Sequence, residues 1–159
     1  MDNNSNASIL IVDDEEMVTA SLRNLFKLQT NYRTLTFTSP AEALVHASND
    51  AFDLVVSDYL MPGMDGITFL ARFKEIQPQA MRILLTGYAD KQSAIRAINQ
   101  VGLYQYIEKP WDNDSLLISV KNALEKATLL RSLDLKIQEL QAARLSLTDF
   151  QNDLIRAFI

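Results

Sequence analysis

Short apolar runs alternate with stretches of helical periodicity over most of the chain. Five runs of four to six residues have the length and composition of buried strands, namely residues 8–12, 32–37, 54–57, 82–86 and 105–108. Between them, apolar residues recur every three or four positions, as Val18, Leu22 and Phe26 do. Because strands that alternate with helices pair in parallel, the pattern predicts an α/β fold, a doubly wound five-stranded parallel sheet covered on both faces.

Local signals mark where some of these helices begin and end. Ser39 stands before Pro40 and three residues before Glu42, which is the arrangement of an N-cap, a first-turn proline and a capping box. We expect Asp90 to be the N-cap of the helix between the fourth and fifth strands. Gly102, just beyond the last apolar residue of that helix, is expected to end it.

Polar side chains follow four of the five predicted strands. They are Asp13 and Asp14 after the first strand, Asp58 at the third, Thr86 at the fourth and Lys109 after the fifth. Each one alone has an ordinary explanation in a turn or on the surface. However, the carboxyl ends of parallel strands share one edge of the sheet, where such folds bind ligands. Together they predict a site with three carboxylates, one hydroxyl and one ammonium group.

The chemistry of this set favours a metal ion and a phosphoryl group. Three carboxylates close together repel one another and need compensation. Oxygen ligands suit a hard cation, and Mg²⁺ prefers a few carboxylates plus water and substrate oxygens. An ionised carboxylate can accept a phosphoryl group without a general base. Lys109 and Thr86 would then contact the phosphoryl oxygens, one as a charge and the other as a hydrogen-bond donor.

Composition narrows the class of protein further. The formal net charge of −5 argues against nucleic-acid binding by this segment. The chain contains no cysteine, which excludes disulfides, thiolate catalysis and cysteine-ligated zinc. The polar, acidic start is unlike a signal peptide, and no apolar run reaches the length of a membrane span. We therefore expect a cytoplasmic protein.

The strand-end residues and their neighbours resemble the receiver domain of bacterial two-component response regulators. The matching segments are IVDDE at 11–15, SDYLMPGMDG at 57–66, LLTG at 84–87 and YIEKP at 106–110. The resemblance covers roughly residues 7–124, where we expect a receiver domain. It implies the flavodoxin-like strand order 2-1-3-4-5. It also implies a phosphorylation-dependent signalling switch rather than an enzyme acting on a separate substrate.

The resemblance assigns the metal ligands and the acceptor. Asp58 corresponds to the residue that takes a phosphoryl group from a sensor histidine kinase or a phosphotransfer protein. Asp13 and Asp14 correspond to Mg²⁺ ligands. Asp58 and the backbone carbonyl of Leu60 would complete the protein's share of the metal shell. The domain would catalyse only its own phosphoryl transfer and dephosphorylation.

The same resemblance assigns the residues that sense the phosphoryl group. Lys109 and Thr86 correspond to its contacts. Tyr106 corresponds to the aromatic switch residue that changes rotamer when Thr86 is drawn to the phosphoryl group. The peptide bond between Lys109 and Pro110 is often cis in such domains.

A long helical pattern without glycine or proline fills the end of the chain. One heptad position is always leucine, at Leu133, Leu140, Leu147 and Leu154, and the other holds Leu130, Ile137, Arg144, Gln151 and Phe158. This predicts an extended C-terminal coiled-coil helix over 125–159 that forms a homodimer. A single helix folding back on the receiver is the alternative. The evenly mixed charges are unlike a basic DNA-reading helix. We expect this linker to lead to an effector domain beyond Ile159.

Two other functions share some of these features. An aspartyl-phosphate hydrolase would carry its nucleophile on the first strand in a D-x-D pattern, whereas Asp13 and Asp14 are adjacent. A pseudo-receiver that serves only as a scaffold would not need the full acidic set. The favoured function is a switch that passes the state of Asp58 through the last helix to an output domain.

Overall fold

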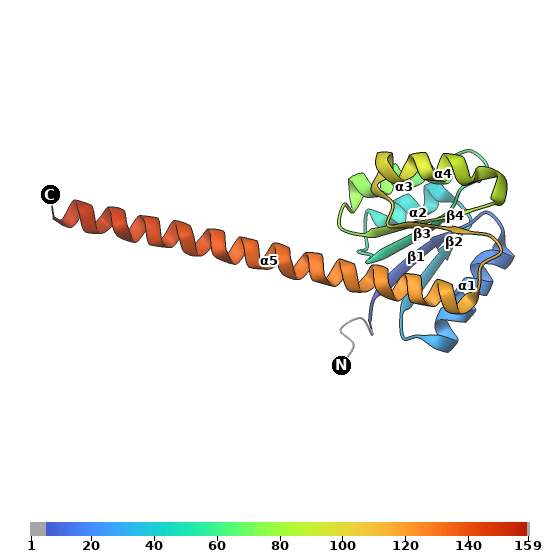
Figure 1. Cartoon of the computed structure of the whole chain (residues 1–159), viewed down its shortest axis with the longest axis horizontal. Coiled ribbons are helices and arrows are strands. Elements are labelled where there is room, and N and C mark those ends of the chain that lie inside the picture. The colour runs from blue at the N-terminus through green and yellow to red at the C-terminus, as the bar shows by residue number, and fades with distance from the viewer. Residues whose placement is uncertain (1–5, 159) are drawn as a thin grey trace. The chain divides into compact units, whose positions relative to one another are not determined.

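The structure of the chain, a computed structural model, describes residues 6–158 (Figure 1). The chain divides into two compact units, Met1–Ala127 and Thr128–Ile159. The first unit contains the sheet, and the second is helical. Within the described residues, no helix is both long enough and apolar enough to cross a membrane.

Strands and helices alternate in the first unit, as the hydrophobic pattern predicts. The strands are β1 (Ser8–Val12), β2 (Arg33–Phe37), β3 (Leu54–Asp58), β4 (Met81–Thr86) and β5 (Gln105–Glu108). The helices are α1 (Glu16–Gln29), α2 (Pro40–Ala47), α3 (Gly66–Ile76), α4 (Lys91–Ala97) and α5 (Asn113–Ala157). All neighbouring strands are parallel, in the order β2-β1-β3-β4-β5. The predicted fold and strand order are confirmed.

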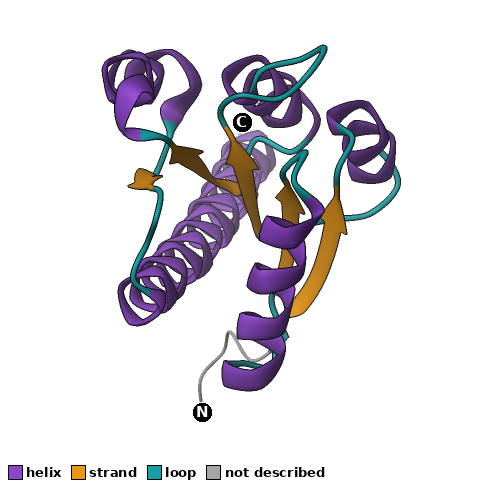
Figure 2. Ribbon diagram, turned by 90° about the vertical axis from the view of Figure 1, so that its right-hand side faces the viewer, coloured by secondary structure: helices purple, strands orange, loops and turns teal. Residues whose placement is uncertain are grey.

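Helices cover both faces of the sheet (Figures 1 and 2). Along β1, Leu10 and Val12 point into the cluster under α2, α3 and α4, whereas Ile9 and Ile11 point into the cluster under α1 and the first turns of α5. Successive side chains of a strand face opposite sides, so a strand covered on both faces is apolar at every position. This explains why the sequence shows continuous apolar runs rather than alternation.

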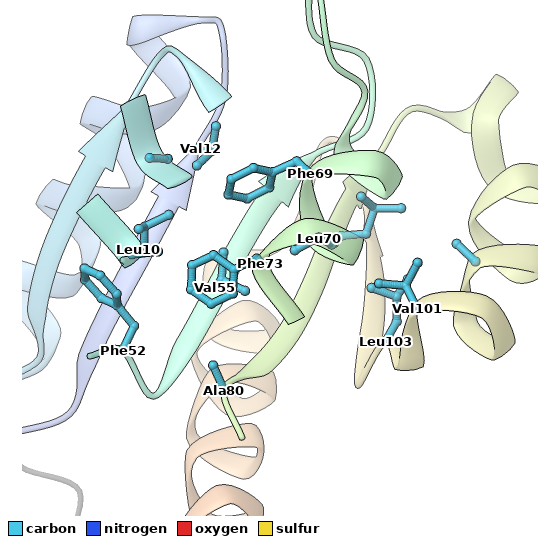
Figure 3. Packing of buried hydrophobic residues seen from close by; sticks show 14 of the residues in the cluster. Leu10, Val12, Phe52, Val55, Phe69, Leu70, Phe73, Ala80, Val101 and Leu103 are labelled. Atoms are coloured by element: carbon cyan, nitrogen blue, oxygen red, sulfur yellow. The ribbon is translucent and has the colours of Figure 1, made fainter. Parts of the chain in front are cut away.

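Aromatic side chains fill the centre of both clusters. Phe69 and Phe73 of α3 pack in the cluster on one face of the sheet (Figure 3), and Phe26 of α1 is buried on the other. Each is fully enclosed, and burying such a side chain stabilises the fold by roughly 1.5–3 kcal/mol. This packing holds the carboxyl ends of the strands, where the polar residues lie, in fixed positions relative to one another.

The helix that follows β4 differs from the sequence prediction. A 3₁₀ turn at Tyr88–Asp90 precedes α4, and a π-helical segment at Ile98–Gly102 follows it. Asp90 occupies the N-cap position of α4, as predicted, but its side chain makes no capping hydrogen bond. The backbone N–H of Asp90 already bonds to the carbonyl of Gly87, so the chain turns before Asp90 rather than after it. Gly102 ends the helix with a φ of 66°, as expected.

Candidate functional site

Three aspartates meet at the carboxyl edge of the sheet. Asp13 follows β1 and Asp58 ends β3, and the register that pairs Val12 with Ser57 places the two aspartates side by side. One carboxylate oxygen from each of Asp13, Asp14 and Asp58 lies within 4.8 Å of the others. Asp13 and Asp58 are buried, whereas Asp14 is exposed. The cluster is therefore enclosed on the protein side and reachable from solvent at Asp14.

One lysine joins two of these carboxylates. Nζ of Lys109 lies 2.9 Å from Oδ2 of Asp13 and 3.1 Å from Oδ1 of Asp58. Lys109 follows β5, its backbone N–H donates to the carbonyl of Thr86, and its peptide bond to Pro110 is cis. Lys109 contacts two of the three carboxylates, and no other ion pair to the cluster occurs within residues 6–158, so the cluster retains a negative charge. Such a cluster fits a divalent cation.

Backbone N–H groups fix the orientation of the two buried carboxylates. The N–H of Glu15 donates to Oδ1 of Asp13 at 2.9 Å, and the N–H of Tyr59 donates to Oδ1 of Asp58 at 3.0 Å. Oδ1 of Asp58 thus contacts both the backbone N–H of Tyr59 and the ammonium group of Lys109. In the part of the chain that the structure describes, Oδ2 of Asp58 accepts no hydrogen bond, which leaves this oxygen available for chemistry.

The charges in the cluster shift two ionisation equilibria. Burial raises the pKa of Asp58 to about 6, and the negative charge of Asp13 adds to the rise while Lys109 opposes it. Burial alone would lower the pKa of Lys109, but its hydrogen bonds to Asp13 and Asp58 outweigh that effect and raise it. At neutral pH, Asp58 is therefore mostly ionised and Lys109 is protonated. Both charged forms are the ones that phosphoryl or metal chemistry requires.

Two residues that the sequence prediction left without a role clamp the backbone at Asp58. A Cβ at Gly66 would lie 1.9 Å from the carbonyl oxygen of Asp58, so only glycine fits at the start of α3. The hydroxyl of Ser57 donates to the same carbonyl, and the N–H of Gly66 donates to the carbonyl of Tyr59. These contacts shape the loop that carries Leu60, whose side chain is exposed. Gly66, the second glycine of MPGMDG, was the available signal in the sequence, but its close approach to the carbonyl of Asp58 cannot be deduced from residue spacing.

Thr86 and Tyr106 lie on the neighbouring strands β4 and β5. Thr86 is buried, and within the described residues its hydroxyl has no hydrogen-bond partner. A buried hydroxyl without a partner is costly, so its presence at this edge fits a ligand that accepts its hydrogen bond. Tyr106 pairs with Leu84 in the sheet register, two residues before Glu108, which pairs with Thr86. It is partly buried and packs against the hydrophobic cluster under α2, α3 and α4.

Comparison with known proteins gives a consistent result for the first unit. The model of the response regulator receiver domain family matches residues 9–121. The hydrogenase transcriptional regulatory protein HoxA of Cupriavidus necator is 36% identical over 135 residues, which cover 83% of this chain. The C4-dicarboxylate transport transcriptional regulatory protein DctD of Rhizobium meliloti is 34% identical over 77% of this chain. The chain spans 28% of the length of HoxA and 26% of that of DctD.

Solved structures match the same region. The signal receiver domain of an HD domain-containing protein from Pseudomonas fluorescens Pf-5 superposes with a TM-score of 0.75 and 35% identity. That match covers 80% of this chain and 93% of the other. NtrX from Brucella abortus, solved in complex with ADP, has a TM-score of 0.76 and 29% identity, and the match covers 81% of this chain and 29% of NtrX.

Proposed function

The chain belongs to the response regulator receiver family, whose domains serve phosphorylation-dependent signalling, and on that premise we propose that Asp58 is its phospho-acceptor. One observation carries this proposal. Asp58 is the buried carboxylate that lies among the acidic cluster, contacts Lys109 and keeps one oxygen without a hydrogen bond in the described residues. Asp13 lacks that freedom, because Glu15 and Lys109 occupy its two oxygens.

We further propose Mg²⁺ as the metal of this site. The side chains of Asp13, Asp14 and Asp58 and the carbonyl of Leu60 would hold it. Three hard carboxylate donors and an excess of negative charge suit this ion. When bound, such an ion would supply positive charge to offset the negative charge of the phosphoryl oxygens, while the residues above hold it beside Asp58.

The residues of the chain would divide the chemistry as follows. A carboxylate oxygen of Asp58 attacks the phosphorus of a phosphohistidine, so that an oxygen–phosphorus bond forms and the nitrogen–phosphorus bond of the donor breaks. Lys109 keeps its proton and attracts the phosphoryl oxygens, and Thr86 donates its hydroxyl to one of them. Thr86 would thereby move, and Tyr106 would change rotamer behind it. Water later removes the phosphoryl group, so the domain catalyses only its own loading and unloading.

The donor that fits this chemistry is a sensor histidine kinase or a phosphotransfer protein. Receiver domains of the family interact with such proteins. HoxA and DctD are transcriptional regulators that are much longer than this chain. We therefore propose a receiver at 7–124 and a linker at 125–159 that connects it to an output domain. The cytoplasmic location expected from the sequence remains a prediction.

We also propose that the chain forms a homodimer through residues 125–159. Every residue from 129 to 158 is exposed in the single chain, including the leucine row at Leu133, Leu140, Leu147 and Leu154. A stripe of exposed leucines along a helix normally finds a partner. A second copy is the simplest one, because two-fold dimers are the commonest assembly.

Loading with a small phosphoryl donor tests the proposal. The protein is incubated with acetyl phosphate and Mg²⁺, and its intact mass is followed. We expect the gain of one phosphoryl mass, none in Asp58→Asn, and a normal gain in the control Glu75→Gln, whose exposed carboxylate lies in the last turns of α3. Asp14→Ala should raise the Mg²⁺ concentration needed for loading. Equal loading of Asp58→Asn would refute the assignment, and continuous turnover of a phosphate ester would support a hydrolase instead.

A further inference from the structure

The tail, defined here as residues 128–158, carries two heptad seams that share one row of leucines. The shared row is Leu133, Leu140, Leu147 and Leu154. The first seam adds a row that starts three residues before Leu133 and repeats every seven residues. Its members are Leu130, Ile137, Arg144, Gln151 and Phe158. The second adds Leu129, Lys136, Ala143, Phe150 and Ala157. Both sets alternate spacings of three and four residues, which is the spacing of a coiled-coil core.

The two seams have their polar residues in different halves of the tail. The first seam is apolar as far as Leu140 and then contains Arg144 and Gln151. The second seam contains Lys136 in its first half and is apolar from Leu140 to Ala157. Each seam therefore encloses one basic residue that the other leaves at its flank. Since a polar core residue lowers the stability of a coiled coil, neither seam is favoured along its whole length.

Charge and exposure both favour a second copy of the tail as the partner. The four basic residues of the tail are balanced by four acidic ones, Arg131, Lys136, Arg144 and Arg156 against Asp134, Glu139, Asp149 and Asp153. Two tails thus meet without net repulsion, although the whole chain has a formal charge of −5. The large apolar residues of both seams are exposed, and Leu129 and Phe150, which belong only to the second seam, are 69% and 60% exposed.

We propose that two tails pair in either of these two registers, and that phosphorylation of Asp58 shifts the balance between them. This inference rests on the homodimer proposed above. Moving from one seam to the other rotates each helix by about 50°, half the angle between consecutive residues. α5 runs as one helix from Asn113 to Ala157, and Leu116, Val120 and Leu124 pack its first turns against the sheet. Because this helix is continuous in the backbone, a rotation of its first turns would be passed on to the tail, and two competing registers would make the tail a two-state element.

Cysteine cross-linking distinguishes the two registers, because the chain contains no cysteine of its own. Four single variants are oxidised under identical conditions. Leu147→Cys lies in both seams, Arg144→Cys only in the first and Ala143→Cys only in the second. Ala142→Cys, in the same turn, lies in neither and is the control. Each is compared with and without acetyl phosphate and Mg²⁺, and again in the Asp58→Asn background.

We expect Leu147→Cys to cross-link in every condition and Ala142→Cys to form no disulfide cross-link. Ala143→Cys and Arg144→Cys should both cross-link, and phosphorylation should change the ratio of their rates several-fold, but not in Asp58→Asn. Lys136→Leu should raise cross-linking at position 143, and Gln151→Leu should raise it at position 144.

Two results would overturn the inference in different ways. If Leu147→Cys does not cross-link, the proposed homodimer itself fails. If Leu147→Cys does cross-link, the two-register proposal is overturned by a cross-link at only one of positions 143 and 144 in all conditions. It is equally overturned by a ratio that phosphorylation leaves unchanged, and in both cases the dimer stands.

Discussion

At the scale of single residues, the balance of charge at the carboxyl edge of the sheet governs the site. Asp13 and Asp58 are buried next to each other, and one lysine partly compensates them. Residue types in this cluster could be predicted from the sequence, because parallel strands bring their carboxyl ends to one edge. The contacts of Ser57 and Gly66 with the carbonyl of Asp58 could not be predicted, since they depend on the path of the loop after β3.

The raised pKa of Asp58 predicts a dependence of stability on pH. Its folded pKa of about 6 lies above the ordinary value of 3.8, so protonation stabilises the fold. This contribution is complete below pH 3.8 and is lost as the pH rises through 6. Asp58→Asn is always neutral, so without Mg²⁺ it should exceed the wild type in unfolding free energy by about 3 kcal/mol at pH 7.5.

Urea unfolding in the presence of a chelator measures this difference. The gain of Asp58→Asn should disappear near pH 4, and Mg²⁺ should reduce it at pH 7.5 by compensating the ionised carboxylate of the wild type. The surface variant Glu75→Gln should show no comparable gain. Equal stabilities of Asp58→Asn and wild type at pH 7.5 would contradict the charge balance described for this site.

The close approach at Gly66 predicts a second effect at the residue scale. Gly66→Ala would force its methyl group against the carbonyl of Asp58, and overpacking of this kind costs about 1–3 kcal/mol. Mg²⁺ affinity should fall as well, because the loop that carries Leu60 must shift. Gly87→Ala is the control, since its new methyl would meet nothing closer than Oδ2 of Asp90 at 3.4 Å. Trp111, the one tryptophan of the chain, lies two residues after Lys109, so its fluorescence can follow a Mg²⁺ titration. This titration and urea unfolding measure both effects, and similar values for the two variants would count against the clamp.

At the scale of elements, hydrophobic periodicity predicts the order of strands and helices but not the details of α4. The apolar residues Ala94, Ile98 and Val101 fit an α-helical repeat, and the structure nevertheless ends this segment in a π-helix. Spacings of three and four residues do not reveal the extra residue of a π-helical turn. Asp90 is the N-cap of α4, as predicted, but the sequence pattern reveals neither the preceding 3₁₀ turn nor the lack of a capping hydrogen bond from the Asp90 side chain.

A matched pair of aspartates tests this difference between two helix starts. Asp65 precedes α3, and its side chain accepts a hydrogen bond from the N–H of Thr68 at 2.7 Å. Asp65→Ala should therefore lower the free energy of unfolding by about 1 kcal/mol. Asp90→Ala should cost much less, because Asp90 makes no side-chain cap bond. Equal losses in urea unfolding would show that Asp90 does cap α4 in solution.

At the scale of the whole molecule, the sequence predicts both a compact α/β unit and a helix with an apolar stripe. The compact unit is confirmed by the family match and by the fold. The stripe is exposed in the single chain, and its pairing remains a proposal. The heptad spacing predicts self-association but cannot select between two seams, because both contain the same leucines.

Charged substitutions in the leucine row test self-association. Leu133→Asp with Leu140→Asp places carboxylates in both seams, so we expect light scattering to change from the mass of a dimer to that of a monomer. The control pair, Gln138→Asp with Asn152→Asp, adds the same charge outside both seams and should remain dimeric. A chain that ends at Ala127, the last buried residue of α5, should be a folded monomer that still accepts a phosphoryl group. A wild-type protein that stays monomeric at high concentration would contradict the coiled coil and leave the receiver assignment intact.

The position of the phosphoryl group after loading tests the central claim most directly. The loaded protein is reduced with borohydride, which converts an aspartyl phosphate to homoserine, and the modified residue is located by tandem mass spectrometry. We predict homoserine at position 58 alone, with none at positions 13 and 14, and only in samples that contained Mg²⁺. Modification at another carboxylate, or at position 58 without any divalent cation, would contradict the account of this site.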